Sequence, residues 1–126
     1  MRESLSERFL DRLFSRPKRK SPKPNCYGLA RSELGLGSDE FRDPEQIWDD
    51  YVRTDDLNSA DILAFLDMST YLGKPETVHA VANKPDKDGN IRHRRDCGQP
   101  VESIPLNELI DYHKSRGHVV VGFKIS

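Results

Sequence analysis

The sequence has 126 residues, of which 35% are hydrophobic and 33% charged, so it fits one folded domain and excludes a wholly disordered chain. Charge is uneven, since residues 1–24 carry a net charge of +5 and the remaining residues −6, which gives −1 for the whole chain. No stretch approaches the ~20 apolar residues of a membrane span, and no signal-peptide pattern opens the chain. We therefore expect a protein that is cytoplasmic as synthesised.

An amphipathic helix is predicted for residues 1–15, because apolar side chains recur there at helical spacing on one stripe. Residues 16–24 hold three prolines and five basic residues, which predicts an extended linker. The basic arm over residues 2–23 could bind a partner protein or an anionic surface, or it could be a solvated extension. Nucleic acid is the partner that we least expect. Residues 25–126 form the predicted globular domain.

The globular domain opens with a predicted helix. Asn25 can cap this helix, Cys26 lies in its first turn, and Gly35 or Gly37 can end it. A second short helix is predicted over residues 44–52, because Pro at the first helical position follows a capping Asp. The buried side of this second helix would consist of Ile47, Trp48 and Tyr51.

The rest of the chain alternates between predicted strands and one further helix. Three short apolar or alternating runs predict strands, at 61–66, 78–84 and 90–95. Residues 86–89 have turn composition, which predicts that 78–95 forms an antiparallel hairpin. A helix is predicted over 106–114 and a closing strand over 118–125. These elements predict an α+β fold. In it, the helix that holds Cys26 packs against an antiparallel sheet of about four to six strands, and the helix over residues 1–15 is an N-terminal addition.

Cys26, His79 and His93 could form a catalytic group. Cysteine attacks as the thiolate, which the first turn of a helix favours, and backbone N–H groups there could receive an oxyanion. His79 could take the thiol proton as a general base and later protonate a leaving amine. His93 lies fourteen positions further on and could fix the tautomer of that base by a hydrogen bond. A simple packing role for Cys26 stays open.

The order NCYGL, ADILAF, HAVA, DGNIRH and VVVGF resembles the NlpC-type branch of papain-like cysteine peptidases, especially its phage-tail members, over residues 25–124. In that family Asp- or Asn-Cys-x-Gly opens the nucleophile helix, a later strand brings the base, and a His after an Asp-Gly turn completes the triad. The resemblance therefore implies Cys26 as nucleophile, His79 as base and His93 as the residue that orients the base. The chain departs from the family pattern, without losing a catalytic group, at Tyr27, Ala60, Ala80 and Ala82.

The same resemblance implies a papain-like fold, no cofactor, and a peptide substrate. Members of the family hydrolyse γ-D-glutamyl-diaminopimelate linkages in the peptides of bacterial peptidoglycan. Because that substrate lies outside the cytoplasm, the protein would need delivery by a virion, by a secretion apparatus or through lysis. A recycled muropeptide or a host protein glutamine would be a cytoplasmic target instead.

Two other interpretations of the globular domain stay open. It could be a catalytically silent papain-like module for assembly or binding, such as a phage-tail or toxin-delivery component. Alternatively Cys26, His79, His93 and Cys97 could bind zinc, although the two close-spaced ligand pairs of most structural zinc sites are missing.

Four further residues that could in principle be reactive are not expected to take part in catalysis. Cys97 is a poor nucleophile, because a glycine and a proline follow it and no helix begins there. His113 and His118 lie at a helix end and a strand start, where an imidazole can cap the helix or face solvent, and we expect them to be structural or neutral. Asp61 is expected to form a turn or loop hydrogen bond.

Overall fold

A computed structural model describes residues 23–69 and 75–125. The helix predicted over 1–15 and nearly all of the linker predicted over 16–24 lie outside the described residues. The described residues form three α-helices and six strands, and each strand pair is antiparallel. The predicted α+β class is therefore confirmed.

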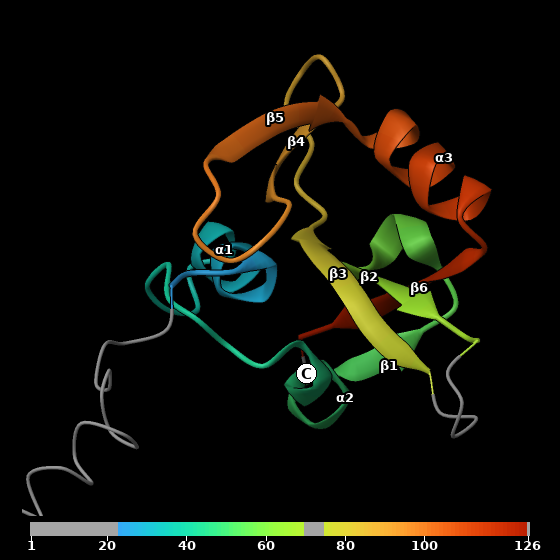
Figure 1. The fold of residues 1–126 in the computed structure, drawn as a ribbon, viewed down its shortest axis with the longest axis horizontal. Helices are drawn as coiled ribbons and strands as arrows, with labels where there is room; N and C mark the ends of the chain where they lie inside the picture. Colours follow the sequence, from blue (N-terminus) through green and yellow to red (C-terminus); the bar gives the residue numbers. More distant parts are fainter. Residues whose placement is uncertain (1–22, 70–74, 126) are drawn as a thin grey trace, which may run out of the picture.

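A four-stranded sheet lies at the centre of the molecule, in the order β1-β6-β2-β3 (Figure 1). Side chains alternate along β2, so that Ile62 and Ala64 join one hydrophobic cluster while Leu63 and Phe65 join another. This alternation follows from strand geometry, in which successive side chains point to opposite faces. The sheet is thus buried on both faces, and its strands are β1 (Val52–Thr54), β2 (Ile62–Asp67), β3 (Glu76–Ala82) and β6 (His118–Lys124).

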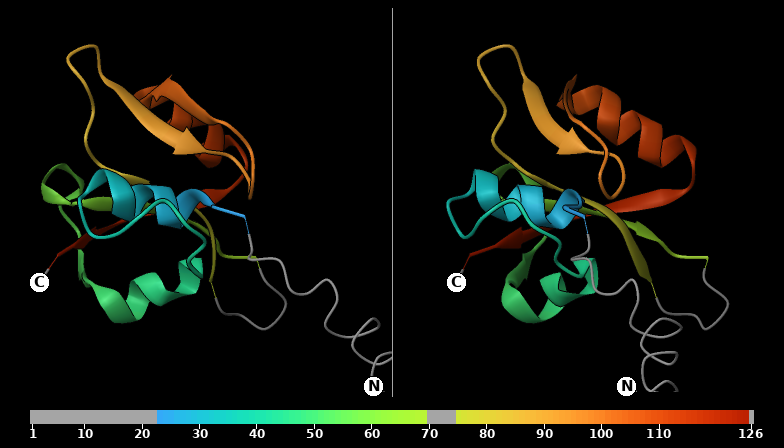
Figure 2. Two further views of the ribbon diagram at one scale, coloured as in Figure 1. Left: turned by 90° about the vertical axis from the view of Figure 1, so that its left-hand side faces the viewer. Right: turned by 60° about the vertical axis from the view of Figure 1, so that its left-hand side comes forward.

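Different elements cover the two faces of this sheet (Figure 2). The helix α2 lies on one side, and α3 lies on the other together with a second, two-stranded sheet formed by β4 and β5. The helix α1 packs against β3, which is an edge strand, and against β4. The bounds of these elements are α1 (Cys26–Glu33), α2 (Ile47–Asp50), α3 (Leu106–Ser115), β4 (Asn90–Arg94) and β5 (Val101–Pro105).

The hairpin predicted over 78–95 is wrong. β3 pairs with β2, whereas β4 pairs with β5, a strand that the sequence analysis missed. The predicted turn does form, because the Asp86 carbonyl accepts the Gly89 N–H at 2.9 Å, and Gly89 has a φ of 83°, which glycine adopts without steric cost. α1 packs against β3 and β4, and β4 pairs with the segment that follows it, β5.

The helix predicted over 44–52 is shorter than expected. A 3₁₀ turn, Pro44–Gln46, precedes α2, and the chain becomes extended at Tyr51 before β1. Pairing of β1 with β6 ends the helix, which illustrates how tertiary contacts override local propensity. On the predicted buried side Ile47 is fully buried, but Trp48 is 37% exposed. Within residues 23–69 and 75–125, the other predicted strands and the helix predicted over 106–114 begin and end within two residues of the expected positions, and α1 begins at Cys26 as expected.

Candidate active site

Cys26 is the first residue of α1 and is buried, with 8% of its surface exposed. The preceding residue, Asn25, is fixed by three hydrogen bonds. Its Oδ1 accepts the N–H groups of Gly28 and Arg42, each at 3.1 Å, and its Nδ2 donates to the Arg42 carbonyl at 2.7 Å. A β-carbon on Gly28 would collide with the carbonyl oxygen of Glu40, so this first turn tolerates little change. The backbone that carries the Cys26 thiol is therefore held in place on both sides.

Burial raises the pKa of the Cys26 thiol above its usual range, and backbone hydrogen bonds from Ala80, Tyr27 and Cys26 itself oppose this rise only in part. A helix start by itself favours the thiolate. Here the loss of hydration is the larger effect, because a buried sulfur anion has no water to stabilise it. Cys26 is thus a neutral thiol near neutral pH, and it would need a base to become a nucleophile.

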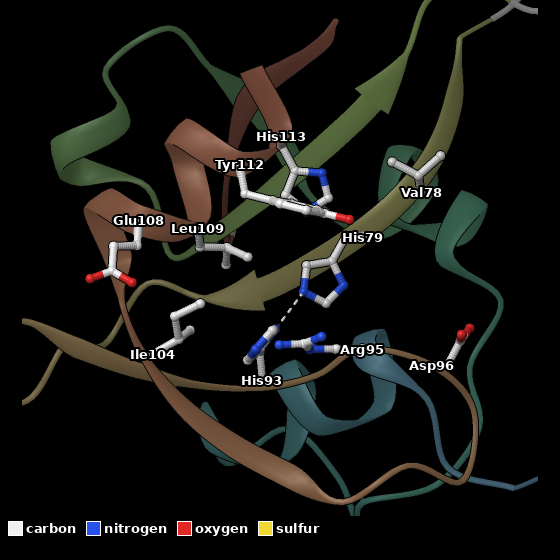
Figure 3. A pocket seen from close by; sticks show the side chains of 10 residues that line it. All are labelled: Val78, His79, His93, Arg95, Asp96, Ile104, Glu108, Leu109, Tyr112 and His113. Carbon is white, nitrogen blue, oxygen red and sulfur yellow. Dashed lines mark hydrogen bonds between the residues drawn. The ribbon is translucent and has the colours of Figure 1, made fainter. Parts of the chain in front are cut away.

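The two predicted histidines lie side by side. The Nε2 atom of His79, on β3, is 3.0 Å from the Nδ1 atom of His93, on β4 (Figure 3). Both side chains are buried, with 4% and 3% exposure. Burial, followed by the charges of His93 and His113, lowers the pKa of His79 to about 3, and burial is also the main cause that lowers the pKa of His93. Both imidazoles are therefore neutral at pH 7.

Cys26 reaches the same strand as His79 but does not bond to its ring. The backbone N–H of Ala80, the residue that follows His79 on β3, lies close enough to the thiol to lower its pKa. Among the hydrogen bonds of residues 23–69 and 75–125, none joins the Cys26 sulfur to either imidazole. Two of the three predicted site residues are thus in direct contact, and the third contacts the neighbouring backbone.

A cavity of about 430 Å³ opens beside the imidazole pair. Its volume is in the range of pockets that hold small ligands. Side chains of α3 face the imidazole pair across this space, as Figure 3 shows, and Cys26 is not among the lining residues. The cavity is lined by Val78, His79, His93, Arg95, Asp96, Ile104, Glu108, Leu109, Tyr112 and His113.

His113 contributes more to this region than a helix cap or a solvent-facing ring would. Its ring is 7% exposed and stacks on Phe65 and on His79, with centroid separations of 4.2 Å and 5.4 Å. Its Nδ1 atom lies 2.9 Å from Nδ1 of His118, and burial is the main cause that lowers its pKa to about 4. The sequence did carry a signal, because His113 follows the buried Leu109 by four positions and so lies on the apolar stripe of α3.

The remaining residues singled out from the sequence have ordinary surroundings. Within the two described stretches, no three His, Cys, Asp or Glu side chains are placed to hold a metal ion, so the four suggested zinc ligands do not gather. Cys97 is exposed. Asp61 accepts the Ile125 N–H at 2.9 Å, which confirms its predicted hydrogen-bonding role. In the described part of the chain, no helix has both the length and the apolar character needed to span a membrane.

The chain was also compared with known proteins. It matches none of the family models, none of the curated proteins and none of the solved structures. The likeness to NlpC-type peptidases consequently stands on the residues of this chain, and the functional argument has to come from the chemistry of Cys26, His79 and His93.

Proposed function

We propose that this protein is a papain-like cysteine hydrolase of the NlpC type, which cleaves an amide bond through an acyl-enzyme on Cys26. The observation that carries the proposal is the buried pair of neutral imidazoles, His79 on β3 and His93 on β4, whose facing nitrogens are 3.0 Å apart. The Cys26 thiol lies close to the backbone N–H of Ala80, the residue after His79. A base that is neutral at pH 7, oriented by a second ring and adjacent to a thiol, is the arrangement that nucleophilic cysteine catalysis needs.

The proposed reaction begins from a neutral thiol and a neutral imidazole. The Nδ1 atom of His79 takes the proton as Sγ of Cys26 attacks the substrate carbonyl, and backbone N–H groups at the start of α1 stabilise the oxyanion. The imidazolium then protonates the leaving amine, which leaves a thioester on Cys26. Water attacks the thioester and gives its proton to His79, and the free acid departs with restoration of the thiol. His93 holds the His79 ring in the tautomer with Nδ1 free.

The proposed substrate is a peptide, with γ-D-glutamyl-diaminopimelate linkages of peptidoglycan as the first choice. The family resemblance supports this choice, and the cavity beside His79 and His93 offers room for one side of such a peptide. Because peptidoglycan lies outside the cytoplasm, the proposal includes delivery by a virion or a secretion apparatus. The basic arm over residues 2–23 could assist by contacting a partner protein or an anionic surface.

The burial of Cys26 favours a second candidate, a silent papain-like module that serves in assembly or binding. The thiol has a raised pKa, and within the described residues it forms no hydrogen bond to an imidazole. A packing residue would have these same properties. Such a module, in a phage tail or a toxin-delivery particle, would work equally well with alanine in place of cysteine.

Turnover of defined muropeptides by the full chain separates the two candidates. Cys26→Ala should abolish cleavage, His79→Ala should lower it by at least about a hundredfold, the usual contribution of a general base, and His93→Ala should be milder. Cys97→Ala is the matched control, because Cys97 is the other free thiol, and it should cleave at the wild-type rate. Equal turnover by all four variants would contradict the proposed site, and no turnover by wild type on any muropeptide would favour the silent module.

A further inference from the structure

Glu102 lies beside the imidazole pair on the strand that the sequence analysis missed. In the antiparallel pairing of β4 with β5, Glu102 is directly opposite His93. Its Oε1 atom is 3.6 Å from Nε2 of His93. That nitrogen is completely buried and has no hydrogen-bond partner within ordinary bonding distance. A buried polar atom without a partner is costly, and the carboxylate is the acceptor that a small side-chain movement would bring to it.

The contact between His79 and His93 restricts the protons of both rings. A neutral imidazole carries one N–H donor and one bare nitrogen, so one of the two facing nitrogens must donate to the other. If His79 is to accept a proton at Nδ1, its own proton sits on Nε2 and is donated to Nδ1 of His93. The proton of His93 must then sit on Nε2, which is the atom that faces Glu102. Each nitrogen in this series has one defined role.

We propose that Glu102 is a positioning residue that keeps the proton of His93 on Nε2 and thereby keeps Nδ1 of His79 free to act as a base. The proton arrangement itself follows from the geometry of the three side chains. Its consequence for catalysis rests on the proposed hydrolase function. Positive charge that develops on His79 during the reaction is also stabilised by the carboxylate through the intervening ring.

Other charged groups face the same rings and set the balance. Arg95, the residue after β4, donates from Nε to the same Oε1 atom of Glu102 at 3.1 Å, so this guanidinium competes with His93 for the carboxylate. Burial is the main cause that lowers the pKa of His93; the carboxylate of Glu102 opposes this lowering, and the charge of Arg95 adds to it. From α3, His113 lies against His79, and Glu108 lines the cavity. Arg95 and Glu102 therefore have opposite effects on one ring.

Imidazole nitrogen NMR on the full chain tests the proton arrangement without requiring any enzymatic activity. In wild type at pH 7.5, the spectrum should identify the Nε2–H tautomer of both His79 and His93. Glu102→Gln should lower the pKa of His93 further and mix its tautomers, whereas Arg95→Gln should raise that pKa. Glu108→Gln is the matched control, since it removes a carboxylate from the same cavity on the opposite wall, and it should leave the His93 tautomer unchanged.

Several results would overturn this inference. These are an Nδ1–H tautomer of His93 in wild type, an unchanged tautomer in Glu102→Gln, or shifts of equal sign in Glu102→Gln and Arg95→Gln. If cleavage is found, Glu102→Gln should lower kcat by about tenfold with little change in KM, the order expected for loss of a hydrogen bond to a charged group. If Cys26→Ala leaves cleavage intact, the proposed hydrolase site is wrong and Glu102 has no role in catalysis. The tautomers measured by NMR would still decide whether Glu102 orients His93 and His79.

Discussion

The two faces of the central sheet are equally well buried but contain different kinds of side chain. One, here called the apolar face, is formed by the cluster Tyr27, Ile47, Ile62, Ala64, Leu66, Ala80, Val121 and Phe123. On the other, here called the imidazole face, His79 and His113 stack on Phe65 and His93 meets His79. Burial stabilises both faces, but on the imidazole face it also holds titratable rings in their neutral form.

Cys26 lies where the two faces meet. The next residue, Tyr27, belongs to the apolar face, while the thiol contacts the backbone of Ala80, adjacent to His79. Adjacent residues of β3 thus belong to different faces, since Ala80 packs into the apolar face and His79 belongs to the imidazole face. Mutations on the two faces should have distinguishable consequences.

The largest expected effect is loss of a buried aromatic ring from either face. Phe123→Ala and Phe65→Ala should each lower the free energy of unfolding by about 3–5 kcal/mol, because both rings are almost fully buried. Urea unfolding at pH 7.5 measures this loss. The milder variants Phe123→Leu and Phe65→Leu keep the chain folded, and of these only Phe65→Leu should shift the NMR titration of His79. Equal shifts from both would contradict the separation of the two faces.

The next effect is a pH dependence that arises on the imidazole face. The pKa of His79 is about 3 in the folded chain and about 6.5 when unfolded. Between these values the unfolded chain binds the extra proton, so the stability from His79 is fully present above about pH 6.5 and is lost as the pH falls toward 3. From pH 7.5 to pH 5 this one ring should account for a loss of about 2 kcal/mol.

Urea unfolding at these two pH values, in wild type and in His79→Gln, isolates that contribution from those of the other titratable groups. His79→Gln should have a clearly smaller pH dependence than wild type. Phe123→Leu is the control from the apolar face and should retain the wild-type dependence. A His79→Gln variant with the full wild-type slope would mean that His79 is not held neutral by the fold.

The sequence predicted most of the apolar face and only part of the imidazole face. Short apolar or alternating runs identified β2, β3 and β6, because such runs can be recognised from neighbouring residues alone. The strand β5 was missed, since its sequence, VESIP, alternates weakly and ends in proline. Without β5 the register of Glu102 opposite His93 could not be found, because cross-strand neighbours depend on pairing rather than on spacing along the chain.

The site itself was predicted in the same partial way. The turn composition of residues 86–89 predicted a hairpin that would bring His79 and His93 together, and the two rings do meet, but they meet across two separate sheets. The expected activation of Cys26 by the helix start could not be weighed against desolvation, because burial of the thiol depends on packing of α1 against β3, a strand about fifty residues further along the chain. The local sequence identifies the candidate catalytic side chains, whereas tertiary packing determines their pKa values.

The smallest expected effect concerns Asn25, at the junction of the two faces. Asn25→Ser keeps a hydroxyl that can cap α1 but loses the hydrogen bonds to Arg42, so the free energy of unfolding should fall by about 1 kcal/mol. Asn107→Ser, at an exposed position on α3, is the control and should change stability little. A loss in Asn25→Ser no larger than in the control would show that the Arg42 loop does not hold the start of α1.

The most direct test of the central claim, that Cys26 and His79 act as a pair, is the rate of iodoacetamide alkylation of Cys26 against pH. It is followed by peptide mass spectrometry in wild type and His79→Ala, with Cys97 in the same chain as the internal control. We expect alkylation of Cys26 between pH 6 and 8 to slow in His79→Ala while Cys97 is unaffected, because the buried thiol loses its base. Identical pH profiles of Cys26 in the two proteins would contradict the pair and identify Cys26 as a packing residue.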